Sequence, residues 1–199
     1  RYRGSEAEKK FAKEFKFGAV VRGFFRERLE FYLRDARGFA YDVVNAVLAA
    51  DADDVVDVLA RAEAVSKVRT SPDFGAISSS FKRTKNILRQ ASEASREVAL
   101  QVNAALLQED AEKALAAQVP EAAKKVEALR ADRNYEKALL EIGKLRPAID
   151  HFFDKVMVMA DDANVRANRL ALLQTLLKEF STIADFSEIV TEGKESSKQ

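Results

Sequence analysis

The segment DDANVRANRLALLQTLLKEF, residues 161–180, decides the fold of this chain more directly than any other stretch. From Leu170 to Leu177 its leucines recur every three or four residues, which is the spacing of one apolar helix face. The aspartate pair that opens it is typical of a helix start, because a carboxylate there accepts hydrogen bonds from the first free backbone N–H groups. The segment therefore predicts a long helix with one buried side.

Shorter apolar stripes with the same spacing lie upstream, each bounded by turn residues. We expect helices to end at Gly38 and at the Asp51–Asp54 cluster, and to begin after Asp53 or Asp54, at Ser71-Pro72, after Asp132-Arg133-Asn134 and near Pro147. Residues 93–107 predict a looser amphipathic helix, and Gln118-Val119-Pro120 predicts a break in the chain. Residues 152–159 fit a strand or a helix, and helix is preferred because no partner strand is found.

The composition agrees with a helical protein. The 199 residues include only 7 Gly and 3 Pro, and 47% of them are hydrophobic. There is no cysteine, which excludes disulfides and thiolate chemistry, and no apolar run reaches the roughly 20 residues of a membrane span. We predict an all-α helical bundle over residues 21–190. Residues 1–20 are expected to end a segment that connects it to a longer subunit, and residues 191–199 to form a disordered tail.

Motifs of catalytic chemistry are absent from the sequence. It contains no Gly-rich phosphate loop, no GxSxG turn and no HExxH motif. The single histidine, His151, lies between Asp150 and Asp154, but a zinc enzyme needs three protein ligands, and these are usually rich in nitrogen. We therefore predict no catalytic residue and no metal site.

Charge is unevenly distributed although the net charge is only +1. A basic segment at residues 9–37 is followed by an acidic one at 42–63 and by a second basic one at 67–96. Segregated charge can create a local positive surface on a nearly neutral protein, although a solvated helix face is the competing interpretation.

Two stretches of the sequence carry a family resemblance. FKRTKNIL at residues 81–88 follows YDVVNAVLA at residues 41–49, and FFDKVMVM at residues 152–159 runs into NVRANRLALL at residues 164–173. In this order and spacing they resemble the C-terminal region of bacterial glycyl-tRNA synthetase β subunits. The Arg-x-x-Arg-Leu-x-Leu-Leu ending also resembles the wider DALR type of helical anticodon-binding fold.

The resemblance implies a binding function with no catalytic step in this domain. It implies that this domain binds the anticodon arm of glycine tRNA in the cytoplasm, with neither DNA nor a membrane as partner. It also implies a separate catalytic α subunit as partner, which holds ATP and Mg²⁺, so no cofactor is expected here. The residues themselves leave a second interpretation open, in which the bundle is an assembly surface for the α subunit or another protein, suggested by the acidic residues Asp51–Asp57.

Side-chain chemistry and helical position indicate which residues are candidates for tRNA binding. Lysine and arginine neutralise phosphates, and asparagine can read a base edge. In the second basic segment the candidates are Arg69, Lys82, Arg83, Lys85, Asn86 and Arg89, with a solvated face, or a helix-to-helix hydrogen bond for Asn86, as the alternative. In the last helix they are Arg166 and Asn168, whereas Arg169 is expected in a structural ion-pair network with aspartates such as Asp154 and Asp161.

Overall fold

The computed structural model describes residues 23–190, so the predictions for residues 1–20 and for the tail at 191–199 lie outside the described residues. Within the described part, the all-α prediction is confirmed: every regular element is helical. Helical residues 23–31 lead into the π-helical turn η1 (Tyr32–Ala36). The elements that follow are α2 (Tyr41–Ala50), α3 (Val55–Val68), α4 (Pro72–Glu93), η2 (Ala104–Leu106), α5 (Asp110–Ala131), α6 (Tyr135–Gly143), α7 (Arg146–Lys155), α8 (Ala163–Phe180) and η3 (Phe186–Glu188).

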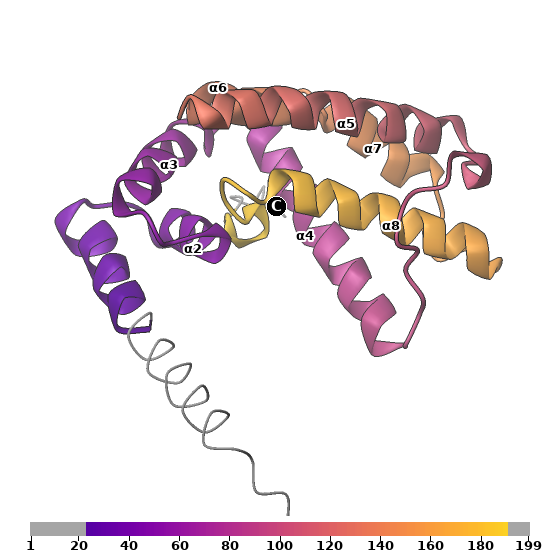
Figure 1. Ribbon diagram of the computed structural model, residues 1–199, viewed down its shortest axis with the longest axis horizontal. Helices are drawn as coiled ribbons and strands as arrows, with labels where there is room; N and C mark the ends of the chain where they lie inside the picture. Colours follow the sequence, from indigo (N-terminus) through magenta and orange to yellow (C-terminus); the bar gives the residue numbers. More distant parts are fainter. Residues whose placement is uncertain (1–22, 191–199) are drawn as a thin grey trace, which may run out of the picture.

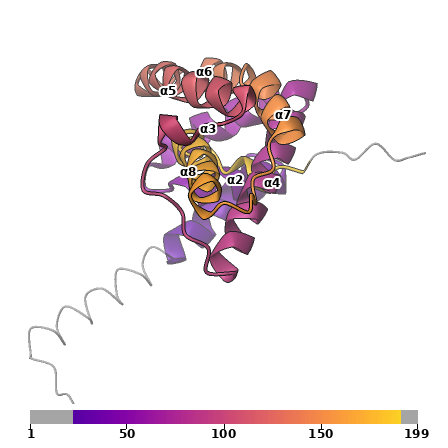
Figure 2. The ribbon, with the colours of Figure 1, turned by 90° about the vertical axis from the view of Figure 1, so that its right-hand side faces the viewer.

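The helices form a connected bundle, in which α6 packs against both α3 and α5, and α4 contacts α6, α7, α8 and η3. Helix α5 lies along α6 and also contacts α7 and α8, while α8 contacts α4 (Figures 1 and 2). Helices α2 and α3 pack together at the other end of the domain, and η3 returns to lie against both α2 and α4. The C-terminal half of α4 projects away from the α5–α6 layer (Figure 1), which leaves much of its surface open to solvent.

The predicted helix boundaries are set by the residues expected to set them. Asp54 accepts hydrogen bonds from the backbone N–H groups of Val56 and Asp57 at the start of α3. Ser71 caps α4 with a 3.2 Å hydrogen bond from the N–H of Phe74, and Pro72 occupies the first turn. Asp162 caps α8 in the same way. Each cap satisfies N–H groups that have no partner inside the helix.

Gly38 ends the first helical segment as predicted. Its φ of 71° lies in the left-handed region, where glycine has no steric penalty. The N–H of Gly38 donates to the carbonyl of Arg34, and the N–H of Phe39 to that of Leu33, which closes the helix.

The predicted break at Pro120 is wrong. Helix α5 continues through this residue for its full 22 residues. Proline in a helix interior costs about 3 kcal/mol because it lacks the N–H and clashes with the preceding turn. The apolar face that contains Leu115, Val119 and Val126 is almost completely buried, and burying each such side chain contributes about 1.5–3 kcal/mol. Tertiary packing therefore outweighs the local cost.

The predicted amphipathic helix at residues 93–107 is also wrong. Helix α4 ends at Glu93, and the following segment is a loop that contains only the short turn η2. Ser95 adopts a left-handed φ of 50°, and the N–H of Arg96 donates to the carbonyl of Ala91 at 2.8 Å, which terminates α4. The loop is then fastened to α8 by hydrogen bonds that an isolated helix could not make.

Residues 156–160 form neither the predicted helix nor a strand. Helix α7 ends at Lys155, and Val156 is extended, with φ −108° and ψ 119°. Val156 and Val158 are buried while Met157 and Met159 are exposed, and residues 158–159 form a turn. No strand lies beside it in the described chain, and the carbonyl of Met157 accepts a hydrogen bond from Arg169 instead.

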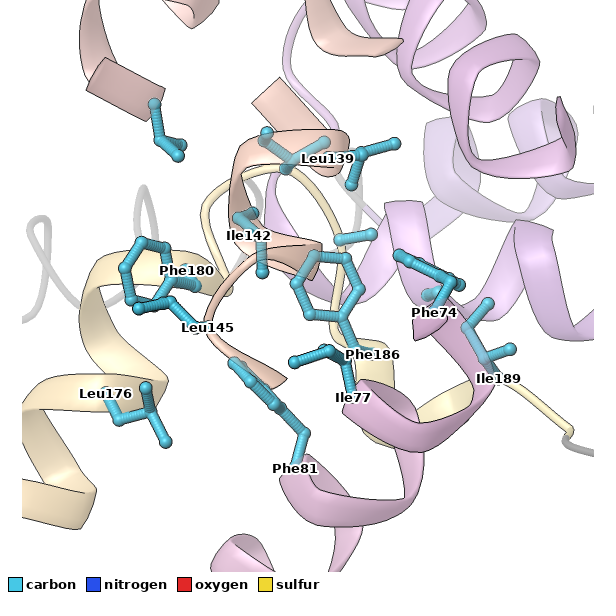
Figure 3. Packing of buried hydrophobic residues seen from close by; sticks show 14 of the residues in the cluster. Phe74, Ile77, Phe81, Leu139, Ile142, Leu145, Leu176, Phe180, Phe186 and Ile189 are labelled. Carbon is cyan, nitrogen blue, oxygen red and sulfur yellow. The ribbon is translucent and has the colours of Figure 1, made fainter. Parts of the chain in front are cut away.

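The core joins segments far apart in the sequence (Figure 3). Its labelled side chains come from α4, α6, the α6–α7 turn, α8 and the segment around η3. Phe186 of η3 packs edge-to-face against both Phe74 and Phe81 of α4, with ring centroids 5.2 Å apart in each pair. Such pairs favour one fixed arrangement. This contact holds α4 in place and so positions its exposed face.

Candidate nucleic-acid interface

The exposed face of α4 belongs to the second basic segment of the sequence, residues 67–96. From Ser79 to Gln90 the helix carries four basic side chains and no carboxylate. Ser79, Lys82, Arg83 and Asn86 are exposed and share a face, since residues three, four and seven positions apart align on a helix. The core residues Ile77 and Phe81 occupy the opposite side.

Lys82, Asn86 and Arg89 are accessible along this face. The side chains of Lys82 and Asn86 form no hydrogen bond or ion pair with any other described residue. The hydrogen bond to another helix that was considered for Asn86 is therefore absent from the described part of the chain. Arg89 makes a 2.7 Å ion pair with Glu93 one turn further on, where both side chains are more than half exposed. An exposed pair of this kind contributes little to stability and can exchange for a phosphate.

Lys85 lies at the edge of the face and is engaged within the protein. Its Nζ is 2.7 Å from a carboxylate oxygen of Asp185, and it also donates to the hydroxyl of Ser187. The hydrogen bond to Asp185 raises the pKa of Lys85. Burial works against ionisation of Asp185, but Lys85 and Ser187 outweigh it and lower the pKa of that carboxyl. Lys85 therefore ties α4 to the η3 segment.

Arg83 lies at the other edge, against α7. Its guanidinium carbon is 4.3 Å from the centroid of the Phe153 ring, which is a cation–π contact. Phe153 is partly buried against the core, with its ring centroid 5.5 Å from that of Phe152. This contact with the Phe153 ring holds the guanidinium of Arg83 at the junction of α4 and α7.

Arg69 has a structural partner that the sequence did not reveal. Its Nη1 is 3.0 Å from the carboxylate of Asp42, which is 1% exposed. The N–H of Val190 donates to the other carboxylate oxygen of Asp42 at 3.0 Å. A buried carboxylate requires such compensation, so Arg69 serves the fold and lies apart from the α4 face.

The two tRNA-binding candidates on α8, Arg166 and Asn168, both hydrogen-bond within the domain but differ in how deeply they are buried. Arg166 is partly buried and donates to the backbone carbonyls of Ala160 and Asp161. Asn168 is 1% exposed; its side-chain oxygen accepts from the N–H of Asn103 at 2.7 Å, and its amide donates to the carbonyl of the same residue. Both polar atoms of Asn168 are satisfied inside the domain. The structure therefore corrects the prediction for Asn168: it fixes the loop before α5.

Arg169 is in a structural ion pair, as predicted, but with a different partner. Its Nε donates to the carboxylate of Glu112 on α5, and its Nη1 donates to the carbonyl of Met157 at 2.9 Å. Glu112 is completely buried and also accepts from the N–H groups of Gln108 and Glu109, so it caps α5 from inside the helix. Asp154 and Asp161, the expected partners, are exposed.

Of the acidic stretch that suggested an assembly surface, Asp57 is engaged within the fold, whereas Asp51, Asp53 and Asp54 are exposed. Asp57 pairs with Arg61, which is 2% exposed and donates to the carbonyls of Val47, Asp51 and Ile183. The hydroxyl of Tyr135 also donates to Asp57. Burial, together with this hydrogen bond, raises the pKa of Tyr135 to about 12. This network could not be predicted from local sequence patterns, because its members are up to 122 residues apart.

No metal-ligand cluster occurs among residues 23–190, and His151 is exposed there. In that same part of the chain no helix combines the length and apolar character needed to cross a membrane.

Comparison with known proteins identifies relatives of this chain. The family model for the DALR anticodon binding domain matches residues 77–190. A glycine–tRNA ligase β subunit from Acidobacterium capsulatum is 58% identical over 174 residues, which cover 85% of this chain and 25% of that protein. The β subunits of Desulfatibacillum aliphaticivorans and Anaeromyxobacter sp. (strain K) are each 43% identical, over 83% and 78% of this chain. The chain spans about a quarter of the length of these curated relatives.

Proposed function

The chain belongs to the DALR anticodon-binding domain family, and from this membership we propose that the exposed face of α4 binds the anticodon arm of a tRNA. The observation that carries the proposal is the run from Ser79 to Gln90, which presents basic side chains and no carboxylate on an accessible helix. Lys82, Arg83 and Arg89 would neutralise phosphates, while Asn86 would contact a base edge. Lys85 would support this surface by holding α4 against the η3 segment.

The identity of the relatives suggests which tRNA is bound. Since the relatives are glycine–tRNA ligase β subunits, we infer that the tRNA is that of glycine and that the chain acts within such a β subunit in the cytoplasm. Its partner would be the catalytic α subunit, with ATP and Mg²⁺ bound there. The described residues contribute binding to aminoacylation and no reacting group.

A salt series tests the binding mode. The chain is titrated with glycine tRNA and with a non-cognate tRNA between low and moderate salt. About four phosphate contacts to a single-stranded region give a log–log slope near −3. Tighter binding of glycine tRNA that is lost when its anticodon is changed supports the proposal, whereas equal binding of both tRNAs contradicts it.

Charge reversal on α4 locates the surface. The double variant Lys82→Glu with Arg89→Glu is expected to abolish measurable tRNA binding without loss of helical content, because both side chains are exposed. Lys124→Glu with Lys125→Glu is the matched control: it makes the same charge change at exposed positions of α5. If the folded α4 variant binds like the control, the assignment of the surface is wrong.

A second function, assembly with the α subunit, is favoured by a different surface. Phe24, Phe25 and Phe31 in the first helical segment are each more than half exposed, and Arg28 lies 5.5 Å from the ring centroid of Phe24. Exposed aromatic side chains with an adjacent arginine are typical of protein interfaces. Co-purification of the α subunit with this chain, lost in Phe24→Ser with Phe25→Ser while tRNA binding is retained, would support it.

A further inference from the structure

An apolar groove of about 800 Å³ lies between α5, α8 and the loop that joins α4 to α5, which runs past α8 in Figure 1. Its apolar side chains are Val98, Leu100, Val102, Ala116, Val119, Pro120, Ala171 and Leu172. The exposed side chains of Gln101, Gln174 and Lys178 also line it. An apolar centre with polar side chains around it is the usual composition of a protein interface.

Leu100 projects from the loop beside this groove, and its side chain is fully exposed. The loop is fastened on both sides of it: the N–H of Ala99 donates to the carbonyl of Ala167 at 3.3 Å, and the N–H of Asn103 donates to the side chain of Asn168. A single exposed leucine is common on protein surfaces. This one is held in place at an apolar groove, and since it buries no surface, the stability of the domain does not account for it.

Pro120 is a second residue at the groove that stability does not explain. A proline in a helix interior is costly, and because it has no N–H, the carbonyl of Ala116 lacks the helical donor four residues later. Ala116 and Pro120 both line the groove. Residues that break a local rule are expected at functional sites. The groove therefore offers a partner an apolar surface and a backbone acceptor.

The charge of the groove suits a protein segment better than RNA. Lys178 and Glu179 are its only charged lining residues, and neither forms an ion pair with a described residue. One positive and one negative charge give no net attraction for a phosphate backbone. An amphipathic segment that lays its apolar side into the groove matches the lining, as in other helix-in-groove complexes.

We propose that the groove is a docking site for an apolar segment from another part of the same β subunit. The chain spans only 25% and 23% of two of the β subunits to which it is similar, so most of such a subunit lies outside it. A segment of the same polypeptide has a high effective concentration, so it covers an apolar groove that a separate protein would bind weakly. This docking site rests on the proposed place of the chain within a β subunit and does not involve the α4 face.

Cysteine labelling tests the docking site, because the chain has no cysteine of its own. Leu100→Cys is treated with a maleimide in this chain alone and in the complete β subunit, and the labelled peptide is followed by mass spectrometry. We expect labelling to be about tenfold slower in the complete subunit, where the undocked state is a minor one. Leu140→Cys is the matched control: it replaces an exposed leucine of α6 outside the groove and should react equally fast in both proteins.

A second reporter separates docking from a change in the loop itself. Lys178→Cys, on the α8 side of the groove, should also be protected in the complete β subunit. Adding Leu100→Asp to it should restore fast labelling, because a carboxylate disfavours an apolar partner. In this chain alone, Leu100→Asp should leave the circular dichroism and the Tm unchanged, since the leucine buries no surface there.

Equally fast labelling of Leu100→Cys in the complete subunit and in this chain overturns the inference. Protection that appears in this chain alone as its concentration rises also overturns it, because the occupant is then a second copy. The same holds for protection that requires the α subunit or tRNA. If Leu100→Cys is protected but the unchanged chain binds no tRNA, the proposed tRNA-binding function fails and the docking site stands.

Discussion

Replacing Arg169 with methionine should destabilise the domain severely, although the residue lies within the part of the chain that matches the anticodon-binding family. Arg169 is 5% exposed and Glu112 is fully buried, so the variant leaves a carboxylate uncompensated in the interior. Removing one partner of a buried ion pair typically costs about 3–5 kcal/mol. Glu112 would retain only the backbone N–H groups of Gln108 and Glu109. Since domains are stable by about 5–15 kcal/mol, this loss is a large share of the total.

The assay is urea unfolding followed by circular dichroism, with the thermal midpoint as a second measurement. At about 2–4 °C per kcal/mol for a protein of this length, we expect a decrease of about 6–20 °C in Tm. Glu112→Gln should also destabilise the domain, because it leaves the buried guanidinium of Arg169 without a counter-charge. The double variant Glu112→Gln with Arg169→Met should cost less than the sum of the two single changes. A loss below about 1 kcal/mol in Arg169→Met, or additive effects in the double variant, would refute the reasoning.

Two further predictions concern Tyr135 and Pro120. Because the pKa of Tyr135 is raised from 10.0 to about 12, its stabilising hydrogen bond to Asp57 is fully present below pH 10 and is lost as the pH rises toward 12. We expect about 2–3 kcal/mol of stability to disappear over that range, measured by urea unfolding at each pH, and Tyr135→Phe should show less of this dependence than the unchanged chain. Pro120→Ala returns an N–H to the interior of α5 at an exposed position and should raise the free energy of unfolding by about 1–3 kcal/mol in the same assay. A decrease instead would mean that the packing of α5 requires the proline.

Helix starts and stops were predictable because the chemistry that sets them is local. Asp54, Ser71 and Asp162 cap their helices through N–H groups two or three residues away, and Gly38 supplies a conformation that other residues rarely adopt. The same local reasoning predicted a helix break at Pro120 and was wrong there. The helix continues because its apolar face is buried against α6, α7 and α8, and these contacts cannot be read from the periodicity of one sequence. The loop after α4 and the non-helical segment after α7 were not predicted for the same reason.

Local sequence patterns were enough to predict that residues 23–190 are mainly helical, where most helices begin, and that α4 carries a basic face opposite its apolar stripe. Which polar side chains remain available at the surface depends on how the helices pack. Asn168 finds Asn103 at a separation of 65 residues, Arg169 finds Glu112 at 57, and Lys85 finds Asp185 at 100. Charged and amide side chains look alike in a sequence whether they face RNA or a buried partner. Their roles differ because burial makes an unpaired polar group costly, and burial is a property of the packed helices.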